Sequence, residues 1–536
     1  MTDLEALKLH RRIDGAIAAW NAPGSPGVTV GVVVGDALVA HRSAGLASVE
    51  FGVPIGPETS FRIASVSKQF TCAAILMLAE EGRLSTDDDV RRHIPELADY
   101  GVTITLDHLM HNTSGLRDML EIMRAGGADL SNPVRPEDLM AGICRQRTLN
   151  FTPGSRYLYS NTNFLLLGRV VERVFGETLR DFLQTRIFDP AGMTGTRMVE
   201  TTTAIVPNLC TGYLPFPGGY VRAQHGFPLH GEGALVSGIA DLALWHTNFA
   251  SGAVCGPQVI ARLMERAPFT NGAVNSYARG LQVNMLRGLQ TVSHGGLWPG
   301  YKTEFLRVPE CDMAVIVIAN NAAADPYQIG QRVLAGMLEG VAGVHPVPSM
   351  PPAEALAPWA GTFLDRDAPA TLELSFSEAG VLSGSSNGVP FALKAEGDGR
   401  LIASRHSRDL ILRLADDAQS LEVEQDAGVA TTYHRVAPGG VLPADLPGVY
   451  RSDEMDATWT ITATPAGMSA RVEGPVTKAS AWELEAVEGD IVRLYAPSNL
   501  YRSWLDIRVR RHAGGRIAGL LVNGGRVRNL VFHRTE

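Results

Sequence analysis

The spacing of hydrophobic and polar residues along this chain of 536 residues changes from one stretch to the next. Two β-rich runs within residues 27–47 flank Gly35-Asp36, which predicts a hairpin. From Ser65 onward, the run SVSKQFTCAAILMLAEEG predicts a long helix closed by Gly82. Helical patterns dominate residues 84–250, strands return over 276–321, and a last helix is predicted over 328–341. A sheet built from both ends of this region, with a helical insert, indicates an α/β plus all-α domain.

The pattern changes after a proline-rich segment. Residues 344–358 hold five Pro, a density that resists both helix and sheet. We therefore predict a first domain over 1–345 and a linker over 346–352. The following sequence consists of short strands and turns, which usually close into sandwiches or barrels.

An internal repeat divides the rest of the chain. Two short runs recur with offsets of 87 and 99 residues: Ala360-Gly361-Thr362-Phe363 as Pro447-Gly448-Val449-Tyr450, and Tyr433-His434-Arg435 as Phe532-His533-Arg534. The second copy is therefore about 12 residues longer than the first. We predict two related antiparallel β-domains, 353–440 and 441–536.

Composition and charge exclude several classes of function. The chain is 45% hydrophobic and 19% charged, as in a folded globular protein rather than a disordered or fibrous one. A net charge of −9 without a basic run argues against a nucleic-acid partner. No run reaches the roughly 18 apolar residues of a membrane span, and the N-terminus lacks the apolar core of a secretory signal.

Cysteine usage bears on location and metal binding. The five Cys form no CxxC pair, and none lies in the last 225 residues. We therefore expect neither a disulfide framework nor a zinc site, and a cytoplasmic location. We also expect no cofactor. A homodimer is compatible with the sequence.

The strongest candidate site is Ser65-Val66-Ser67-Lys68. Only five of the 47 cationic residues are Lys, and only Lys68 has a Ser three positions before it. Three-residue spacing on a helix places Ser65 and Lys68 on one face. A buried Lys68 could lose its proton and act as a base for the Ser65 hydroxyl. The alternative is a helix-capping Ser followed by a solvated Lys.

Two weaker clusters accompany it. Tyr159-Ser160-Asn161 follows a turn, so Tyr159 could relay a proton while Asn161 binds a substrate carbonyl. His294-Gly295-Gly296 ends a β-run, and the two Gly would allow a ligand to approach the backbone closely. Taken singly, each cluster is more typical of a structural Tyr or a structural turn His.

Together and in this order, these motifs resemble the serine penicillin-recognising family of β-lactamases, DD-peptidases, esterases and D-aminopeptidases. The family pattern is S-x-x-K, a middle motif, and K-T-G. Here the middle motif is Y-x-N, and His-Gly-Gly replaces K-T-G. The resemblance covers residues 1–345 and implies a metal-free serine hydrolase.

The sequence most resembles the D-aminopeptidase branch of that family. The signature residues are Ser65 to Ala73 and Ser114-Gly115-Leu116-Arg117-Asp118. The resemblance implies two eight-stranded β-barrels after the catalytic domain, with a loop of the last barrel entering the active site. Our candidate for that loop is Tyr495 to Trp504, with Asn499 and Tyr501 contacting substrate. This segment lacks the acidic residue expected to meet a substrate ammonium.

The resemblance also implies a role for each site residue. Ser65 attacks the carbonyl, Lys68 and Tyr159 move the proton, and His294 assists Tyr159 or the substrate. Asn161 orients the scissile amide. Gly295 and Gly296 line the site, and the backbone N–H groups of Ser65 and Leu297 form the oxyanion hole.

The implied substrates are short peptides with N-terminal D-residues, or small D-aminoacyl amides. The alternatives are an esterase or a D-amino-acid amidase of the same fold, or a binding module without turnover. A second serine motif, Gly384 to Gly388, matches G-x-S-x-G. It lies between β-type runs, where a nucleophile elbow would need a strand and then a helix.

Overall fold

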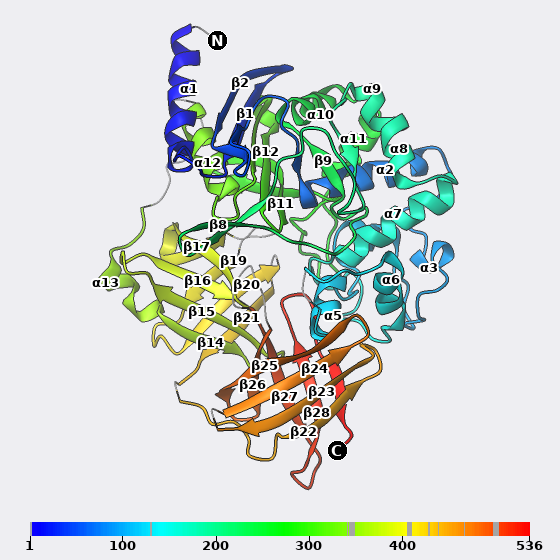
Figure 1. The fold of residues 1–536 in the computed structure, drawn as a ribbon, viewed down its shortest axis with the longest axis vertical. Coiled ribbons are helices and arrows are strands. Elements are labelled where there is room, and N and C mark those ends of the chain that lie inside the picture. The colour runs from blue at the N-terminus through cyan, green and yellow to red at the C-terminus, as the bar shows by residue number, and fades with distance from the viewer. Residues whose placement is uncertain are drawn as a thin grey trace.

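The structure is a computed structural model, and it shows three bodies in contact (Figure 1). The first, with the six-stranded sheet and the helices, lies above two barrels. The described residues are 3–128, 131–339, 341, 349–404, 410–426, 429–437, 439–465, 467–496 and 503–536.

A six-stranded antiparallel sheet forms the centre of the first body, in the order β10-β11-β12-β13-β1-β2. Its strands are β1 (Val28–Val34), β2 (Ala37–Ala44), β10 (Gln282–Leu286), β11 (Leu289–Trp298), β12 (Tyr301–Val308) and β13 (Met313–Ala319). β1 and β2 form the expected hairpin, and β1 also pairs with β13. The prediction that strands from both ends of the region share one sheet is confirmed.

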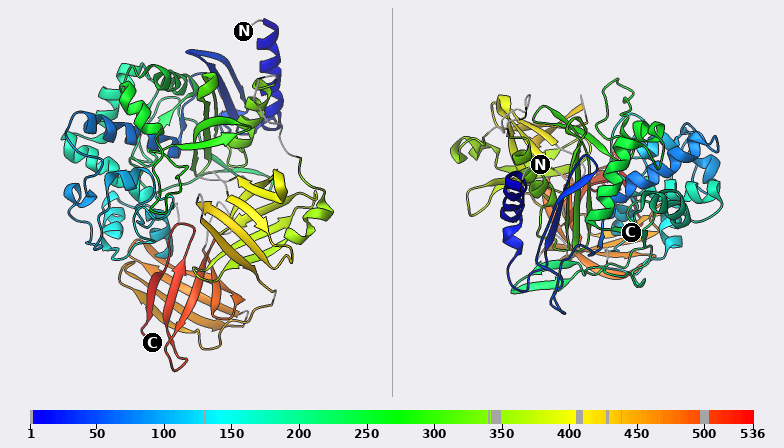
Figure 2. Two further views of the ribbon diagram at one scale, coloured as in Figure 1. Left: turned by 180° about the vertical axis from the view of Figure 1, so that it is seen from behind. Right: turned by 90° about the horizontal axis from the view of Figure 1, so that it is seen from above.

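Helices cover both faces of this sheet (Figure 2). Successive residues of β13 alternate between faces, so Val315 and Val317 pack towards α1 (Asp3–Ile17) and α12 (Pro326–Met337). Ile316 and Ile318 belong to the larger core on the other side. The helices of the insert on that side are α2 (Lys68–Glu80), α3 (Val90–His93), α4 (Leu106–Met110), α5 (Met119–Ala125), α6 (Pro136–Arg145), α7 (Asn161–Phe175), α8 (Leu179–Leu183), α9 (Asp189–Ala191), α10 (Ile239–Ser251) and α11 (Pro257–Met264).

Short strands connect this insert to the sheet. They pair as β3 (Leu46–Ser48) with β4 (Val53–Pro54), β7 (Tyr213–Phe216) with β8 (Gly219–Arg222), and β5 (Phe61–Arg62) and β6 (Arg197–Met198) with β9 (Leu235–Ser237).

The rest of the chain forms two closed eight-stranded antiparallel barrels, as predicted. The first contains β14 (Gly361–Asp365), β15 (Ala370–Phe376), β16 (Leu382–Ser386), β17 (Val389–Glu396), β18 (Arg400–Ser404), β19 (Leu410–Leu414), β20 (Ser420–Asp426) and β21 (Val429–Arg435). The second contains β22 (Gly448–Ser452), β23 (Ala457–Thr464), β24 (Gly467–Gly474), β25 (Thr477–Glu488), β26 (Ile491–Ala496), β27 (Ser503–Arg511), β28 (Ile517–Asn523) and β29 (Leu530–Arg534).

The repeat seen in the sequence is also a structural repeat. The first and last strands of each barrel pair through equivalent residues, Phe363 with Arg435 and Tyr450 with Arg534. β25 and β27 are each four residues longer than their counterparts β17 and β19. Most of the extra length of the second copy therefore lies in longer strands, not in one inserted loop.

The second barrel docks onto helix α5. Ile122 and Ala125 of α5 belong to the apolar core of the barrel, and the Trp459 indole donates a hydrogen bond to the Ala125 carbonyl at 3.0 Å. The backbones meet directly, because a Cβ on Gly474 would lie 2.1 Å from the Gly126 carbonyl oxygen. The barrel is therefore held firmly against the helical insert.

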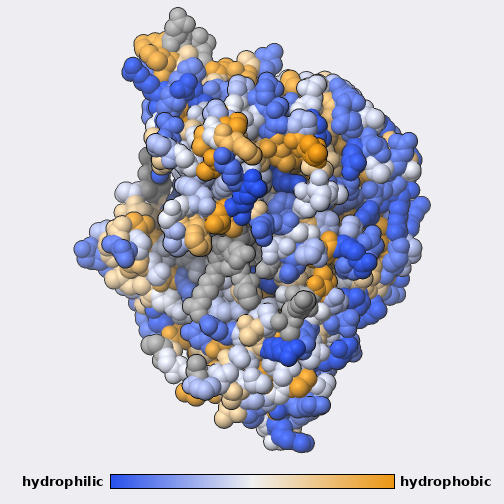
Figure 3. Space-filling model, viewed as in Figure 1, coloured by the Kyte–Doolittle hydropathy of each residue, from blue (hydrophilic) through white to orange (hydrophobic). Residues whose placement is uncertain are grey.

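The outer surface seen in Figure 3 is mostly hydrophilic, with scattered apolar residues. Over the described ranges, no helix is both long and apolar enough to cross a bilayer. Ser386 ends β16, and a turn at Asn387-Gly388 leads into β17. The second serine motif therefore lies on a hairpin and has no following helix.

Candidate active site

Ser65 lies on a tight turn between β5 and α2. The sequence predicted the start of an α-helix here, but Ala64–Ser67 form a 3₁₀ turn and α2 begins at Lys68. Ala64 has a φ of 47°, a left-handed conformation that is strained for a residue with a side chain. The strained turn leaves Ser65 partly exposed, whereas Lys68 is buried.

The Lys68 amine has three acceptors around it. Its Nζ lies 3.0 Å from Ser65 Oγ, 2.9 Å from Asn161 Oδ1 and 2.6 Å from the Glu232 carbonyl oxygen. The solvated-Lys alternative is therefore wrong. Burial lowers the pKa of Lys68 to about 7, with the charge of Glu232 opposing that shift and the charge of Arg526 adding to it. A large share of the amine is neutral near pH 7, as a base requires.

Tyr159 lies beside this amine. The Lys68 Nζ is 4.9 Å from the centre of the Tyr159 ring. Burial raises the pKa of Tyr159 far above its ordinary value, opposed by the charge of Arg526 and by a hydrogen bond with Ser65. The phenol therefore stays protonated at neutral pH and can only pass a proton on as it receives another.

Asn161 is the first residue of α7, and its side chain bridges two groups. Its Oδ1 accepts from Lys68, while its Nδ2 and its backbone N–H donate to Asp118 Oδ2 at 2.9 and 2.7 Å. Asp118 in turn caps α5 through the N–H groups of Leu120 and Glu121. These bonds hold the amide in one orientation with its oxygen on Lys68. Its expected contact with a scissile amide stays a prediction.

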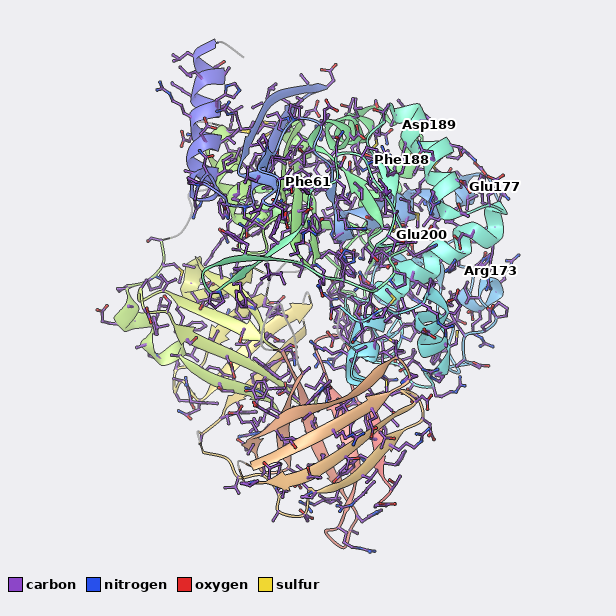
Figure 4. All side chains as sticks on the ribbon, in the orientation of Figure 1. Phe61, Arg173, Glu177, Phe188, Asp189 and Glu200 are labelled. Atoms are coloured by element: carbon purple, nitrogen blue, oxygen red, sulfur yellow. The ribbon has the colours of Figure 1, made fainter. Side chains whose placement is uncertain are left out.

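Helix α7 leads from the site to the periphery of the first body. Figure 4 shows Arg173, near the far end of α7, and Glu177, just beyond it, on the outer surface. Phe61, four positions before Ser65, lies in the interior. Lys68 and Asn161 therefore lie at the buried first residues of α2 and α7.

His294 contacts a second tyrosine, Tyr277, which lies beside Tyr159. Its Nε2 is 2.9 Å from the Tyr277 hydroxyl and its Nδ1 is 2.6 Å from the Gly295 carbonyl oxygen. The His294 and Tyr277 rings lie equally far from Tyr159, with centres 6.1 Å away. Tyr277 was not singled out from the sequence, because nothing local distinguishes it from a core tyrosine.

Strand β11 crosses directly over the turn that carries Ser65. The sequence placed Gly295 and Gly296 after a strand, but both lie inside β11, which continues to Trp298. A Cβ on Gly296 would lie 2.2 Å from the Ile63 carbonyl oxygen, so only glycine permits this approach. Leu297 is the next residue along β11. Its position is compatible with the expectation that its N–H and the N–H of Ser65 together form the oxyanion hole.

The last barrel contacts the site through the loop between β28 and β29, whereas the expected contact of Tyr495 to Trp504 stays a prediction. Asn499 and Tyr501 lie outside the described residues, as does most of Tyr495 to Trp504. The flanking Trp504 donates its indole N–H to Thr371 of the first barrel. It is Arg526, between β28 and β29, whose guanidinium lies 4.7 Å from the centre of the Tyr159 ring.

In the described part of the chain, no three His, Cys, Asp or Glu side chains are grouped so as to hold a metal ion. The groups gathered around Ser65 are an amine, a phenol and a carboxamide, with an imidazole behind them. That set can activate a hydroxyl and carry its proton to a leaving group.

Family models match almost the whole chain. The beta-lactamase family model matches residues 13–335, and the model described as D-aminopeptidase, domain B, matches residues 352–533. Together they span the sheet-and-helix body and both barrels.

Curated relatives are similar over the same length. A D-aminopeptidase of Brucella anthropi is 26% identical over 517 residues, or 95% of this chain and 96% of the relative. A D-aminopeptidase of Gluconobacter oxydans is 28% identical over 83% of each chain, and one of Cereibacter sphaeroides is 27% identical over 99% of each.

Solved structures share the fold. An octameric penicillin-binding protein homologue from Pyrococcus abyssi has a TM-score of 0.57 at 22% identity, covering 81% of this chain and all of that one. The D-amino acid amidase from Ochrobactrum anthropi SV3, complexed with D-phenylalanine, has a TM-score of 0.54 at 22% identity. That match covers 62% of this chain and 99% of the amidase.

Proposed function

The chain belongs to the beta-lactamase family, and from this premise we propose that it is a serine hydrolase working through an acyl-enzyme. Its activity is that of a D-aminopeptidase, which releases N-terminal D-amino acids from short peptides and D-aminoacyl amides. Relatives named D-aminopeptidase cover up to 99% of the chain, both barrels included. The observation that carries the chemistry is the 3.0 Å contact between Lys68 Nζ and Ser65 Oγ.

In the acylation step, Ser65 Oγ bonds to the substrate carbonyl carbon while its proton passes to neutral Lys68. The resulting oxyanion is stabilised by the N–H groups of Ser65 and Leu297, and such donors contribute a few kcal/mol each. When the tetrahedral intermediate collapses, the C–N bond breaks. The leaving amine takes a proton from the Lys68–Tyr159 pair.

Deacylation reverses the roles. Water gives a proton to the same pair, its oxygen bonds to the acyl carbon, and the Ser65 ester bond breaks. The product acid leaves and Ser65 regains its proton. Tyr159 suits this relay because it stays protonated between steps, and Asn161 keeps the amine aimed at Ser65.

An amidase or esterase of the same fold is the second candidate. The observation that favours it is the structural match to a D-amino acid amidase over the first body of this chain. It would use the same groups and differ only in the leaving group.

The test is hydrolysis of D-alanine p-nitroanilide, L-alanine p-nitroanilide and p-nitrophenyl acetate by the full chain. We expect turnover of the D-anilide in excess of the L-anilide, and loss of turnover in Ser65→Ala. Turnover of the acetate alone would identify an esterase. If there were neither turnover nor covalent labelling of Ser65, the only remaining alternative would be a binding module without turnover.

A further inference from the structure

Asn112, which follows helix α4, has a backbone conformation that glycine adopts more readily. Its φ is 56°, in the left-handed region that few residues with a side chain tolerate, Asn among them. The Asn112 N–H donates to the Leu109 carbonyl at 3.2 Å, and the Thr113 N–H donates to the His108 carbonyl at 2.9 Å. These bonds form a Schellman motif, which ends a helix and usually has Gly at this position. The end of α4 therefore does not explain why this position carries an amide side chain.

The Asn112 amide is buried and binds the loop that leads into α7. Its Oδ1 accepts hydrogen bonds from the Ser160 N–H at 3.0 Å and from Asn163 Nδ2 at 2.9 Å. The Asn112 carbonyl oxygen accepts a third, from the Leu158 N–H at 3.0 Å. Leu158 and Ser160 are the two chain neighbours of Tyr159. One residue therefore holds the backbone on both sides of Tyr159.

The loop that carries Tyr159 has no regular secondary structure to fix its position. Residues 156–160 belong to no helix or strand, and α7 begins only at Asn161. No strand ladder therefore supports the backbone at Tyr159. The hydrogen bonds to Asn112 take that part at the residues just before and just after it.

The partners of the Asn112 amide are themselves fixed. Asn163 Oδ1 accepts from the Ser114 hydroxyl at 2.7 Å, which leaves Asn163 Nδ2 directed at Asn112. Asn112, Ser114 and Asn163 are at most 1% exposed, so water cannot easily replace these contacts. A buried donor that loses its acceptor is costly to leave unpaired. Loss of the Asn112 oxygen should therefore make the Ser160 N–H and the backbone beside Tyr159 shift towards a new partner.

The place of the Tyr159 ring matters for the proton relay. The Lys68 Nζ lies 4.9 Å from the centre of that ring, and a displacement of about 1 Å can lower a rate ~100-fold. We propose that Asn112 is a positioning residue that keeps the Tyr159 hydroxyl within reach of Lys68 and Ser65. The inference deepens the proposed function and rests on its acyl-enzyme chemistry.

The experiment is a double-mutant cycle on the full chain, formed by Asn112→Gly and Tyr159→Phe. Gly suits the left-handed position that ends α4, so Asn112→Gly removes the amide without straining the backbone. We expect it to lower kcat about 10- to 100-fold and to leave KM nearly unchanged. In the Tyr159→Phe protein the same substitution should cause little further loss, because no hydroxyl remains to be placed.

Steady-state rates of all four proteins are measured on D-alanine p-nitroanilide and on p-nitrophenyl acetate. The pH is set well above the Lys68 pKa of about 7, so that a change in this pKa does not alter kcat. Circular dichroism reports folding. If Asn112→Gly does not fold, Asn163→Ala takes its place in the cycle. It removes one partner of the amide, so we expect a smaller loss, again only where the Tyr159 hydroxyl is present.

Two further variants serve as rescue and control. Asn112→Asp keeps an oxygen that can accept from Ser160 and Asn163, and Asp tolerates the left-handed conformation, so most of kcat should return. Asn208→Gly is the matched control. It makes the same substitution at another left-handed Asn, which has a φ of 59° and is exposed. It should leave kcat unchanged.

The outcomes separate the two proposals. The role of Asn112 would be overturned by an equal loss of kcat with and without the Tyr159 hydroxyl, by a normal kcat of folded Asn112→Gly, or by a kcat of Asn112→Asp as low as that of Asn112→Gly. If the D-anilide is not hydrolysed but the acetate gives the expected cycle, the D-aminopeptidase activity is refuted and this inference stands. No turnover of either substrate by the unmodified chain would overturn both.

Discussion

At the scale of single residues, the proposed chemistry depends on a lysine whose pKa is lowered by burial. Lys68 is fully buried among acceptors, and its pKa of about 7 gives it a neutral form near physiological pH. The acid limb of kcat/KM reports ionisation in the free enzyme. Activity should therefore rise as pH increases through about 7, because deprotonation of Lys68 creates the base.

Lys68→Arg separates charge from proton transfer. Arg keeps the positive charge but cannot lose its proton, so kcat should fall at least ~100-fold, within the usual range for loss of a general base. Steady-state rates on the D-anilide measure the effect, with circular dichroism as the folding control. A variant with nearly normal kcat would show that the site needs the charge and not the base.

Glu232→Gln tests the electrostatic setting of that base. The charge of Glu232 raises the pKa of Lys68, so its removal should lower that pKa further and move the acid limb to lower pH. The glutamine oxygen can still accept from the His230 N–H as Glu232 Oε1 does. A pH profile of kcat/KM measures the shift. An acid limb that moves to higher pH, or stays in place, would contradict the assignment of this limb to Lys68.

Gly296→Ala tests the crossing of β11 over the nucleophile turn. The added methyl would lie 2.2 Å from the Ile63 carbonyl oxygen, so the strand and the turn must separate. A displacement of about 1 Å can lower the rate ~100-fold, and we expect a loss of at least that size in kcat. Gly56→Ala is the control, since its methyl would meet nothing within 4 Å. If both variants were equally active, the proposed oxyanion hole would not depend on the position of β11.

At the scale of elements, sequence reasoning succeeded where the signal is local. Alternating strands, the hairpin at Gly35 and the proximity of Ser65 and Lys68 each depend on residues a few positions apart. It failed at element ends: Ser65 lies on a 3₁₀ turn, and the two glycines lie within β11. Those ends depend on the crossing of β11 over the turn, a contact between distant segments that no short pattern records.

One buried ion pair should contribute measurably to the stability of the contact between the second barrel and the helical insert. Arg117 is buried, with 1% of its side chain exposed, and its Nη1 is 2.6 Å from Glu454 Oε2. Glu454→Gln leaves that cation without its charged partner, and we expect a loss of about 3–5 kcal/mol in the free energy of unfolding. Urea unfolding measures it.

Asp453→Asn is the matched control. Its side chain is 92% exposed and pairs only with Arg451 among its described ion pairs. Surface pairs of this kind contribute about 0–1 kcal/mol. Equal stability of the Glu454 and Asp453 variants would mean that the buried pair does not hold the barrel in place.

At the scale of the whole molecule, the second barrel contacts the body that carries Ser65. The sequence repeat predicted two related antiparallel β-domains, the family resemblance implied that they are barrels, and both barrels are present. It could not show that the loop of Arg526 lies beside Tyr159, because Arg526 contacts residues such as Asn150 that lie 376 positions earlier. The extra length of the second copy pointed to Tyr495 to Trp504, most of which lies outside the described residues, so that assignment stays a prediction.

The account depends most on Ser65 as the nucleophile, and covalent labelling tests this most directly. The full chain, Ser65→Ala and Ser386→Ala are treated with a serine-directed acylating agent and measured by intact-protein mass spectrometry. We predict one added group on the unmodified chain and on Ser386→Ala, and none on Ser65→Ala. Labelling that persists in folded Ser65→Ala would contradict the account.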